Sequence, residues 1–142
     1  MKIKYLTTLL LTLALGGTAA FAEDEPTPLE KEMKTMNKSL RTLKKQAEDA
    51  AKKDDNLALI ATIKKCVEAA AKLEPAKTKE VPAAEKAAYL DKYKAQMTDL
   101  AKTYDELEAA IKGDKAEDVK KALAKLGEQK EKGHKDFAPD EK

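Results

Sequence analysis

Several residue types are scarce in this sequence of 142 residues, and each shortage excludes a class of protein. The single cysteine, Cys66, cannot form an intramolecular disulfide. One histidine, His134, cannot build a cluster of metal-binding imidazoles. The sequence shows no nucleophile paired with a base, so we expect no catalytic site and no enzyme. The single arginine, Arg41, weakens any case for bidentate recognition of phosphate. Tryptophan and runs rich in isoleucine and valine are absent, which argues against strands.

The first 22 residues have the pattern of a secretory signal peptide. Lys2 and Lys4 precede an uncharged apolar stretch over residues 5–15, and the small residues Ala20 and Ala22 form a cleavage motif. The apolar stretch is shorter than the roughly 20 residues that a membrane anchor needs. We therefore expect cleavage after Ala22, a periplasmic location, and no stable membrane association after cleavage.

The mature chain, residues 23–142, is long enough for one domain and too short for two. Cleavage removes two of the 28 basic side chains, so the remainder equals the 26 acidic ones and the net charge is formally zero. Because phosphate binding needs a surplus of lysine and arginine, nucleic acid is not expected as a partner.

Beyond residue 28 the composition is dominated by alanine, lysine, glutamate and leucine, which is typical of long helices. Prolines and polar turn residues divide the chain: Pro26 and Pro28 open the first helix, residues 54–56 cap the second, residues 75–82 form a linker, and Gly113 precedes the fourth. The pattern predicts helices at about 28–52, 55–73, 83–112 and 115–137.

Each predicted helix has one apolar stripe with alternating spacings of three and four residues, as packing into a bundle requires. The stripes contain Leu29, Met33, Met36, Leu40, Leu43 and Ala47; Leu59, Ile63, Cys66, Ala70 and Leu73; Leu90, Tyr93, Met97, Leu100, Tyr104, Leu107 and Ile111; and Val119, Leu123 and Leu126. Short connections make consecutive helices antiparallel neighbours. The expected fold is all-α, an antiparallel up-down-up-down four-helix bundle.

The fourth predicted helix breaks its own stripe, and the break contains the only histidine. At 100° per residue, His134 lies about 20° from Leu123 in projection and faces the core side. Met33 lies in the second turn of the first helix, and at about 1.5 Å per residue both side chains are within roughly 8 Å of the same bundle end. A thioether and an imidazole can therefore meet there, and this pair is a known axial set for haem iron.

Three segments resemble the cytochrome b562 family: residues 28–40 (PLEKEMKTMNKSL), 114–119 (DKAEDV) and 133–137 (GHKDF). The resemblance extends over essentially the whole mature chain and places the family's axial methionine at Met33 and its axial histidine at His134. It implies a periplasmic electron carrier with one non-covalent haem b and a redox partner protein. The chain lacks the C-x-x-C-H motif of related c-type bundles, since residues 130–134 read KEKGH, so covalent haem attachment by that route is excluded.

Four further residues are expected in the haem surroundings: Met36, Lys130, Gly133 and Phe137. Lys130 falls on the core-facing stripe and is either a charge extending to solvent or a partner of a haem propionate. Gly133 either lets haem approach the backbone or ends the helix before His134.

Other interpretations stay open from the residues alone. Met33 can be ordinary core filler, and His134 can simply interact with a helix C-terminus. A haem-free exported bundle with a structural or interaction role would keep the stripes, and a copper site is a weaker option because one histidine with Met33 and Met36 makes a poor donor set. Cys66 is expected to be a small buried hydrophobe, or else to form an intermolecular disulfide.

Overall fold

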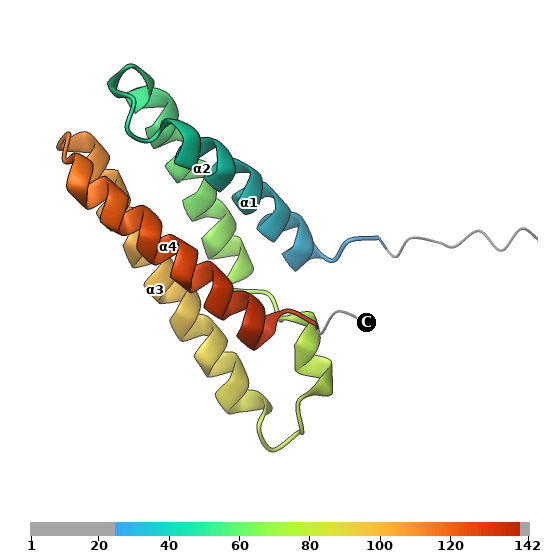
Figure 1. Ribbon diagram of the computed structural model, residues 1–142. Coiled ribbons are helices and arrows are strands. Elements are labelled where there is room, and N and C mark those ends of the chain that lie inside the picture. The colour runs from blue at the N-terminus through green and yellow to red at the C-terminus, as the bar shows by residue number, and fades with distance from the viewer. Residues whose placement is uncertain (1–24, 140–142) are drawn as a thin grey trace, which may run out of the picture.

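The computed structural model describes residues 25–139, and the predicted signal peptide lies outside this range. Four α-helices fill most of it, and two short 3₁₀ helices lie in the connections (Figure 1). Their bounds are α1 Pro28–Gln46, η1 Ala50–Lys52, α2 Lys53–Ala70, η2 Ala76–Glu80, α3 Lys86–Lys112 and α4 Ala116–Phe137. The all-α four-helix architecture expected from the sequence is confirmed.

Helix α1 begins where the sequence predicts, because Thr27 and Glu30 form a capping box. The Thr27 hydroxyl accepts a hydrogen bond from the Glu30 amide at 3.2 Å, and the Glu30 carboxylate accepts one from the Thr27 amide at 2.6 Å. Pro28 occupies the first turn, where its missing N–H has no cost. Two of the donors that every helix start leaves free are thereby satisfied.

The predicted end of the first helix was wrong, since α1 ends at Gln46 and not near residue 52. Asn56, which is fully buried, donates its amide to the Gln46 carbonyl at 3.0 Å and accepts from the Gln46 side chain at 3.0 Å. Asp49 then caps η1 by accepting from the Ala51 amide. Side chains distant from the helix end therefore stop α1, which a local pattern does not reveal.

The predicted cap of the second helix also needs correction. Helix α2 begins at Lys53, so Asp54 and Asp55 lie in its first turn, where their charge is favourable at a helix N-terminus. It ends at Ala70, three residues before the predicted end. The linker contains η2, and α3 begins at Lys86 after a turn that follows Pro82, whereas α4 matches its prediction to within one residue.

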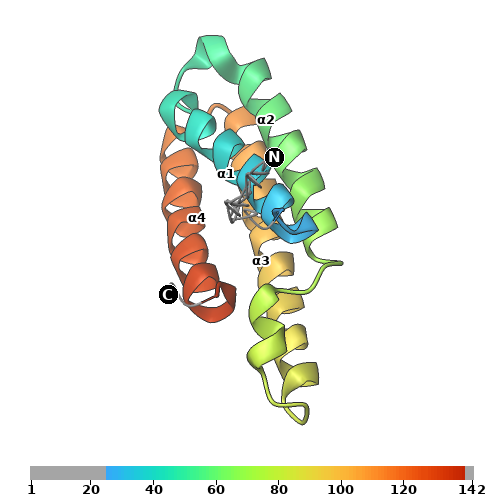
Figure 2. The ribbon, with the colours of Figure 1, turned by 90° about the vertical axis from the view of Figure 1, so that its right-hand side faces the viewer.

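Neighbouring helices run in opposite directions, as an up-down-up-down bundle requires (Figures 1 and 2). Between α2 and α3, Lys53 near the start of one meets Asp114 just beyond the end of the other, and the Tyr93 hydroxyl donates to the Ala70 carbonyl at 2.8 Å. Between α3 and α4, Lys125 pairs with Glu106. The hairpin ends of both pairs thus lie at one end of the bundle.

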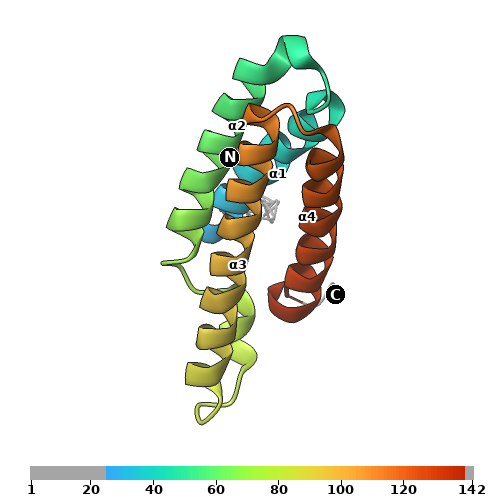
Figure 3. The same cartoon turned by 90° about the vertical axis from the view of Figure 1, so that its left-hand side faces the viewer.

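The four helices do not pack equally on all sides. Among the described residues, close backbone contacts join α1 to α2, α2 to α3 and α3 to α4, whereas the side between α1 and α4 has almost none. Figure 3 shows α4 alongside α3, on the side of α3 away from α2. We call the side between α1 and α4 the α1–α4 seam.

The predicted stripes form most of the core, and Leu43, Ile63 and Leu107 are completely buried. In α2 the prediction needs correction, because Ile60 and Val67 outside the predicted stripe are buried, whereas Leu59 is only half-buried. Cys66 is buried and free, as expected for a small hydrophobe, and burial raises the pKa of its thiol, as does the neighbouring Glu32. No helix of the described residues is long and apolar enough to cross a membrane.

Candidate functional site

A cavity of about 70 Å³ lies in the α1–α4 seam. Helices α1, α3 and α4 supply its lining, which consists of Met33, Met36, Asn37, Leu40, Gln96, Met97, Leu100, Tyr104, Leu126, Gln129, Lys130, Gly133 and His134. The structure thus brings together both predicted iron ligands and three of the four residues predicted around them.

Met33 approaches the cavity from the second turn of α1. It is half-buried and packs against the core cluster, and Met36, one turn further along, is buried. The spacing of three residues puts both thioethers on the inward side of the helix. Met33 is therefore positioned by the same stripe that folds the bundle.

His134 lies in the last turn of α4, at the rim of the cavity. Its backbone carbonyl accepts a hydrogen bond from the Ala138 amide at 3.0 Å, so the helix continues past Gly133 and the alternative in which Gly133 stops it is wrong. The residue as a whole is exposed. His134 therefore contributes to the cavity lining from an exposed position, and its role as a ligand stays a prediction.

The core-facing row of α4 lies one residue earlier than the predicted stripe over part of its length. Ala122 and Gln129 face inward, whereas Leu123 is half-buried and Lys130 is exposed at the cavity rim. Lys130 thus lines the cavity as an exposed charge at its rim, in agreement with the alternative in which it extends to solvent. As an exposed cation beside the opening, Lys130 is placed to meet an anion outside the apolar wall.

Phe137 does not line this cavity. It is buried against α3, with its ring edge-on to Tyr89 and Tyr93 at centroid distances of 5.3 and 5.2 Å, and Lys92 lies 5.9 Å from its centre. This aromatic group closes the bundle below the cavity and holds the end of α4 against α3. Its place in the haem surroundings stays a prediction.

Two glutamines in the cavity wall were not singled out from the sequence. The Gln96 amide donates to the Gln129 backbone carbonyl at 3.2 Å, and the side-chain oxygens of both residues are buried without a hydrogen-bond partner. Leaving a buried acceptor unpaired is costly. The row Val119, Ala122, Leu126, Gln129, Gly133 and Phe137 has helical spacing, and the polar residue in it was the available signal.

Gly133 contributes no side chain to the cavity wall next to His134. A Cβ added there would lie 3.2 Å from the Gln96 amide nitrogen, so the glutamine would have to move. Tyr104 is almost completely buried at the inner end, and burial raises the pKa of its hydroxyl above the ordinary range. The cavity is thus apolar at its base and polar toward the rim.

The donors around this cavity suit a single soft or borderline iron centre held by a planar macrocycle. Met33 offers a thioether sulfur and His134 an imidazole nitrogen, and Met36, Leu40 and Leu126 provide apolar walls. No group of three or more histidine, cysteine, aspartate and glutamate side chains able to hold a bare metal ion occurs within residues 25–139. The two unpaired amide oxygens add acceptors that a bound group with O–H or N–H donors would satisfy.

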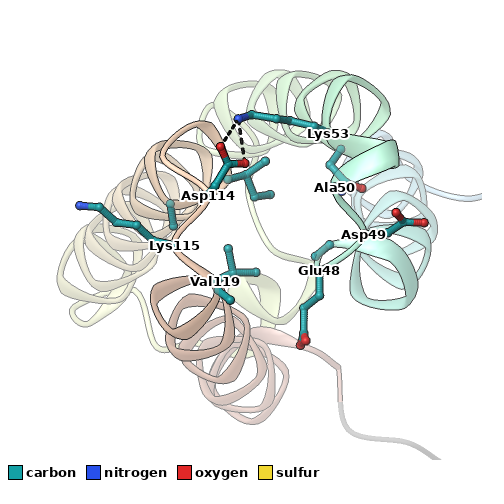
Figure 4. A pocket seen from close by; sticks show the side chains of 12 residues that line it. Glu48, Asp49, Ala50, Lys53, Asp114, Lys115 and Val119 are labelled. Atoms are coloured by element: carbon teal, nitrogen blue, oxygen red, sulfur yellow. Dashed lines mark hydrogen bonds and ion pairs between the residues drawn. The ribbon is translucent and has the colours of Figure 1, made fainter.

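A second cavity, of about 140 Å³, lies at the opposite end of the bundle, between the two hairpin connections (Figure 4). Lys53 closes it on one side through hydrogen bonds to both Asp114 carboxylate oxygens at 2.9 and 3.0 Å. Glu48 and Lys115 also line it, and no sulfur or imidazole does. This end of the bundle is charged and open to solvent, and it lacks the sulfur and imidazole donors found in the α1–α4 seam.

Comparison with known families gives one result that covers the whole bundle. The model of the family described as cytochrome b562 matches residues 28–138, from the first residue of α1 to just beyond the last residue of α4. No curated protein and no solved structure matches the chain significantly. Because the family match includes nearly all described residues, the chain belongs to the cytochrome b562 family, which indicates a haem-binding helical bundle.

Proposed function

We propose that this protein is an exported one-electron carrier that binds one non-covalent haem b, with Met33 and His134 as its axial ligands. The observation that carries the proposal is that these two side chains, 101 positions apart in the sequence, line the same cavity. Nothing in the packing of an ordinary bundle requires the only histidine and a methionine of the first helix to share an opening.

When bound, haem supplies a one-electron iron couple, whose reduction potential a methionine and histidine pair raises. The protein's role is to hold the haem, to orient it and to shield it from water. Met33 from α1 and His134 from α4 would hold the iron. The chemistry that we propose for the bound group is one-electron transfer without catalysis.

The remaining side chains of the cavity divide into an apolar wall and a polar rim. Leu40, Met97 and Leu126 would exclude water from the bound group, and Gly133 would let it approach the α4 backbone. Lys130, exposed at the rim, is placed to pair with a propionate. Phe137 would act indirectly, by holding the last turn of α4 in place.

Haem binding requires the seam to widen, because a cavity of about 70 Å³ is smaller than the roughly 300–1,000 Å³ of typical ligand and cofactor sites. The α1–α4 seam is suited to widening, since it has almost no close backbone contacts and no ion pair links these two helices within the described residues. Both ligands lie on the two helices that would separate. The hairpins α1–α2 and α3–α4 can keep their own contacts during this movement.

The proposed location is the periplasm, on the basis of the signal-peptide pattern of residues 1–22, which lies outside the described range. The proposed partners are the haem and a redox protein that exchanges electrons with it. The location can be checked by cell fractionation of the native host, where the protein should appear with a new N-terminus at Glu23.

The proposal can be tested by adding haemin to the purified protein and recording oxidised and reduced visible spectra. We expect one haem per chain and a sharp low-spin reduced spectrum. Met33→Ala and His134→Ala should each change the spin state and weaken haem retention, because each removes one axial ligand. Met97→Leu is the matched control, since it replaces a buried methionine of the same cavity and should leave the low-spin spectrum in place.

Two outcomes would contradict the proposal. Unchanged spectra in both ligand variants would exclude the ligand assignment, and a complete lack of uptake would favour a haem-free bundle with a structural or interaction role.

A further inference from the structure

Helix α1 differs from the other three helices in its charge. It contains six basic and two acidic side chains, whereas basic and acidic side chains are equal in number in α2 and α3 and nearly so in α4. The mature chain is formally neutral. The positive charge is therefore concentrated on one helix of the bundle and balanced elsewhere.

Four of these basic residues form a single row along the outer face of α1: Lys34, Lys38, Arg41 and Lys45. All four are exposed, and their spacings of four, three and four residues place them within about 60° around the helix axis. Leu43, which is completely buried, lies about 180° from Lys34. We call these four residues the cationic row, and it points directly away from the core.

The cationic row lacks the ion pairs that other parts of the bundle have. Within residues 25–139, none of its members makes an ion pair, although lysines on other helices do: Lys53 with Asp114 at 2.9 Å, Lys64 with Asp105 at 2.6 Å and Lys125 with Glu106 at 3.0 Å. Like charges three or four residues apart destabilise a helix. The row is thus an arrangement that folding disfavours, which points to a use in binding.

The row shares its helix with the candidate site. The same helix contributes Met33 and Met36 to the cavity wall, so the row and the cavity lie on different faces of one helix, whose diameter is about 10–12 Å. Further cations flank the seam: an added Cβ at Gly127 on α4 would lie 3.9 Å from the Lys44 ammonium nitrogen, and Lys130 stands at the rim. A partner bound to α1 would therefore be close to whatever the cavity holds.

The chemistry of the row indicates what binds there. Arg41, the only arginine of the chain, lies in the row, and its planar guanidinium is suited to bidentate pairing with a carboxylate. A membrane-binding helix needs an apolar face to enter the lipid, but the apolar residues of α1, such as Met36 and Leu40, are buried in the core. These observations favour an acidic protein surface over a lipid surface.

We propose that the cationic row of α1 is the docking surface for a protein partner whose contact surface is rich in aspartate and glutamate. Opposite charges steer such partners to the correct face and raise the association rate. The identification of this partner as the redox partner rests on the proposed function, whereas the binding itself does not.

The test uses poly-L-glutamate as the probe and the purified protein without added haem. Binding is measured by calorimetry at low and high salt, and the contact is mapped by amide chemical-shift changes. We expect shifts confined to α1 and the adjoining rim of α4, and binding that disappears at high salt. The quadruple variant Lys34→Gln, Lys38→Gln, Arg41→Gln and Lys45→Gln should reduce the association constant by about tenfold or more.

The matched control removes the same amount of charge elsewhere, through Lys65→Gln, Lys72→Gln, Lys94→Gln and Lys121→Gln, all at exposed positions without an ion pair in the described chain. It should keep its affinity. The α1 variant should also unfold at the same temperature as the parent protein or slightly higher, because repulsion along the helix is relieved. A fall in its stability with unchanged binding would show that the row is structural and overturn the proposal.

Two further results would also overturn it. Equal loss of affinity in both quadruple variants would mean that net charge alone matters. Binding to vesicles of phosphatidylglycerol that depends on the row, with no binding of poly-L-glutamate, would assign the surface to a membrane. If poly-L-glutamate binds through α1 but haemin is not taken up, the docking surface is supported and the proposed electron-transfer role is not.

Discussion

The α2–α3 side of the bundle and the α1–α4 seam are built from similar helices but are held in different ways. Lys64 of α2 contacts both Asp105 and Glu108 of α3, and the Tyr93 hydroxyl bonds to the Ala70 carbonyl across the same interface. The seam has a cavity, two unpaired amide oxygens and exposed cations instead. The difference indicates that stability is concentrated in three interfaces, and the fourth is the one at which we propose that haem binds.

The largest loss of stability should come from removing a side chain in the closely packed part of the core, away from the seam. Leu107→Ala should lower the free energy of unfolding by about 2–5 kcal/mol, because Leu107 is completely buried and its removal leaves a cavity. Met33→Ala in the seam should cost less than about 1 kcal/mol in the haem-free protein, since Met33 is half-buried. Urea denaturation measures both, and equal losses would show that the two interfaces contribute alike.

The Tyr93 hydroxyl gives the next largest effect. Tyr93→Phe removes its hydrogen bond to the Ala70 carbonyl and should lower stability by about 0.5–1.5 kcal/mol. Tyr104→Phe serves as the comparison, since no hydrogen bond of the Tyr104 hydroxyl occurs among the described residues and the change should cost less. A larger loss for Tyr104→Phe would show that the α2–α3 interface is not secured by this bond.

The same tyrosine predicts how stability responds to alkali. Burial raises the pKa of Tyr93 from 10.0 to about 12. Because the folded protein then holds its proton more tightly than the unfolded chain, this contribution is present below pH 10 and is lost as the pH rises from about 10 toward 12. Thermal unfolding followed across this range should show a smaller loss in Tyr93→Phe, and an identical loss in both proteins would contradict the assignment.

A weaker effect is expected from the ion pairs on the same interface. Hydrogen bonds from Lys112 and Lys64 lower the pKa of Glu108, so its contribution is present above pH 4.5 and is lost as the pH falls through its lowered value. Lys64→Met should lower stability at neutral pH by about 0.2–1 kcal/mol and reduce the loss in acid. Lys65→Met, a neighbouring exposed lysine without an ion pair in the described residues, should change neither quantity.

The smallest effect on stability should come from the seam itself. Gly133→Ala should leave the haem-free protein equally stable or more stable by a few tenths of a kcal/mol, because alanine favours a helix and the Gln96 amide can move aside. The same change narrows the cavity and should weaken haem retention in a haemin titration. If the variant loses stability but retains haem normally, Gly133 is not part of the proposed haem site.

The overall architecture could be predicted from the sequence because each helix carries its own apolar stripe. The ends of α1 and α2 could not, because they depend on Asn56 reaching back to Gln46 and on Asp49 capping a short 3₁₀ helix. These are contacts between segments whose relative placement the local pattern leaves open.

The candidate site was predictable in part for a similar reason. Met33 and His134 could be brought to one end of the bundle by counting helical rise, and the structure places them around one cavity. The exposure of His134 could not be predicted, since a helical projection gives a direction but not what covers it. Gln96 and Gln129 were missed because an unpaired amide becomes visible only after the surrounding side chains are packed.

The pair of buried Asn56 and half-buried Gln46 has a consequence for the opposite end of the molecule. Slippage of α1 by one helical turn against α2 would break both of its hydrogen bonds and leave the buried Asn56 amide without these partners. The same slippage would carry Met33 about 5.4 Å along the bundle and away from His134. A polar contact at the hairpin thus fixes the position of Met33 along the bundle relative to His134, the two proposed ligands, from roughly 20 Å away.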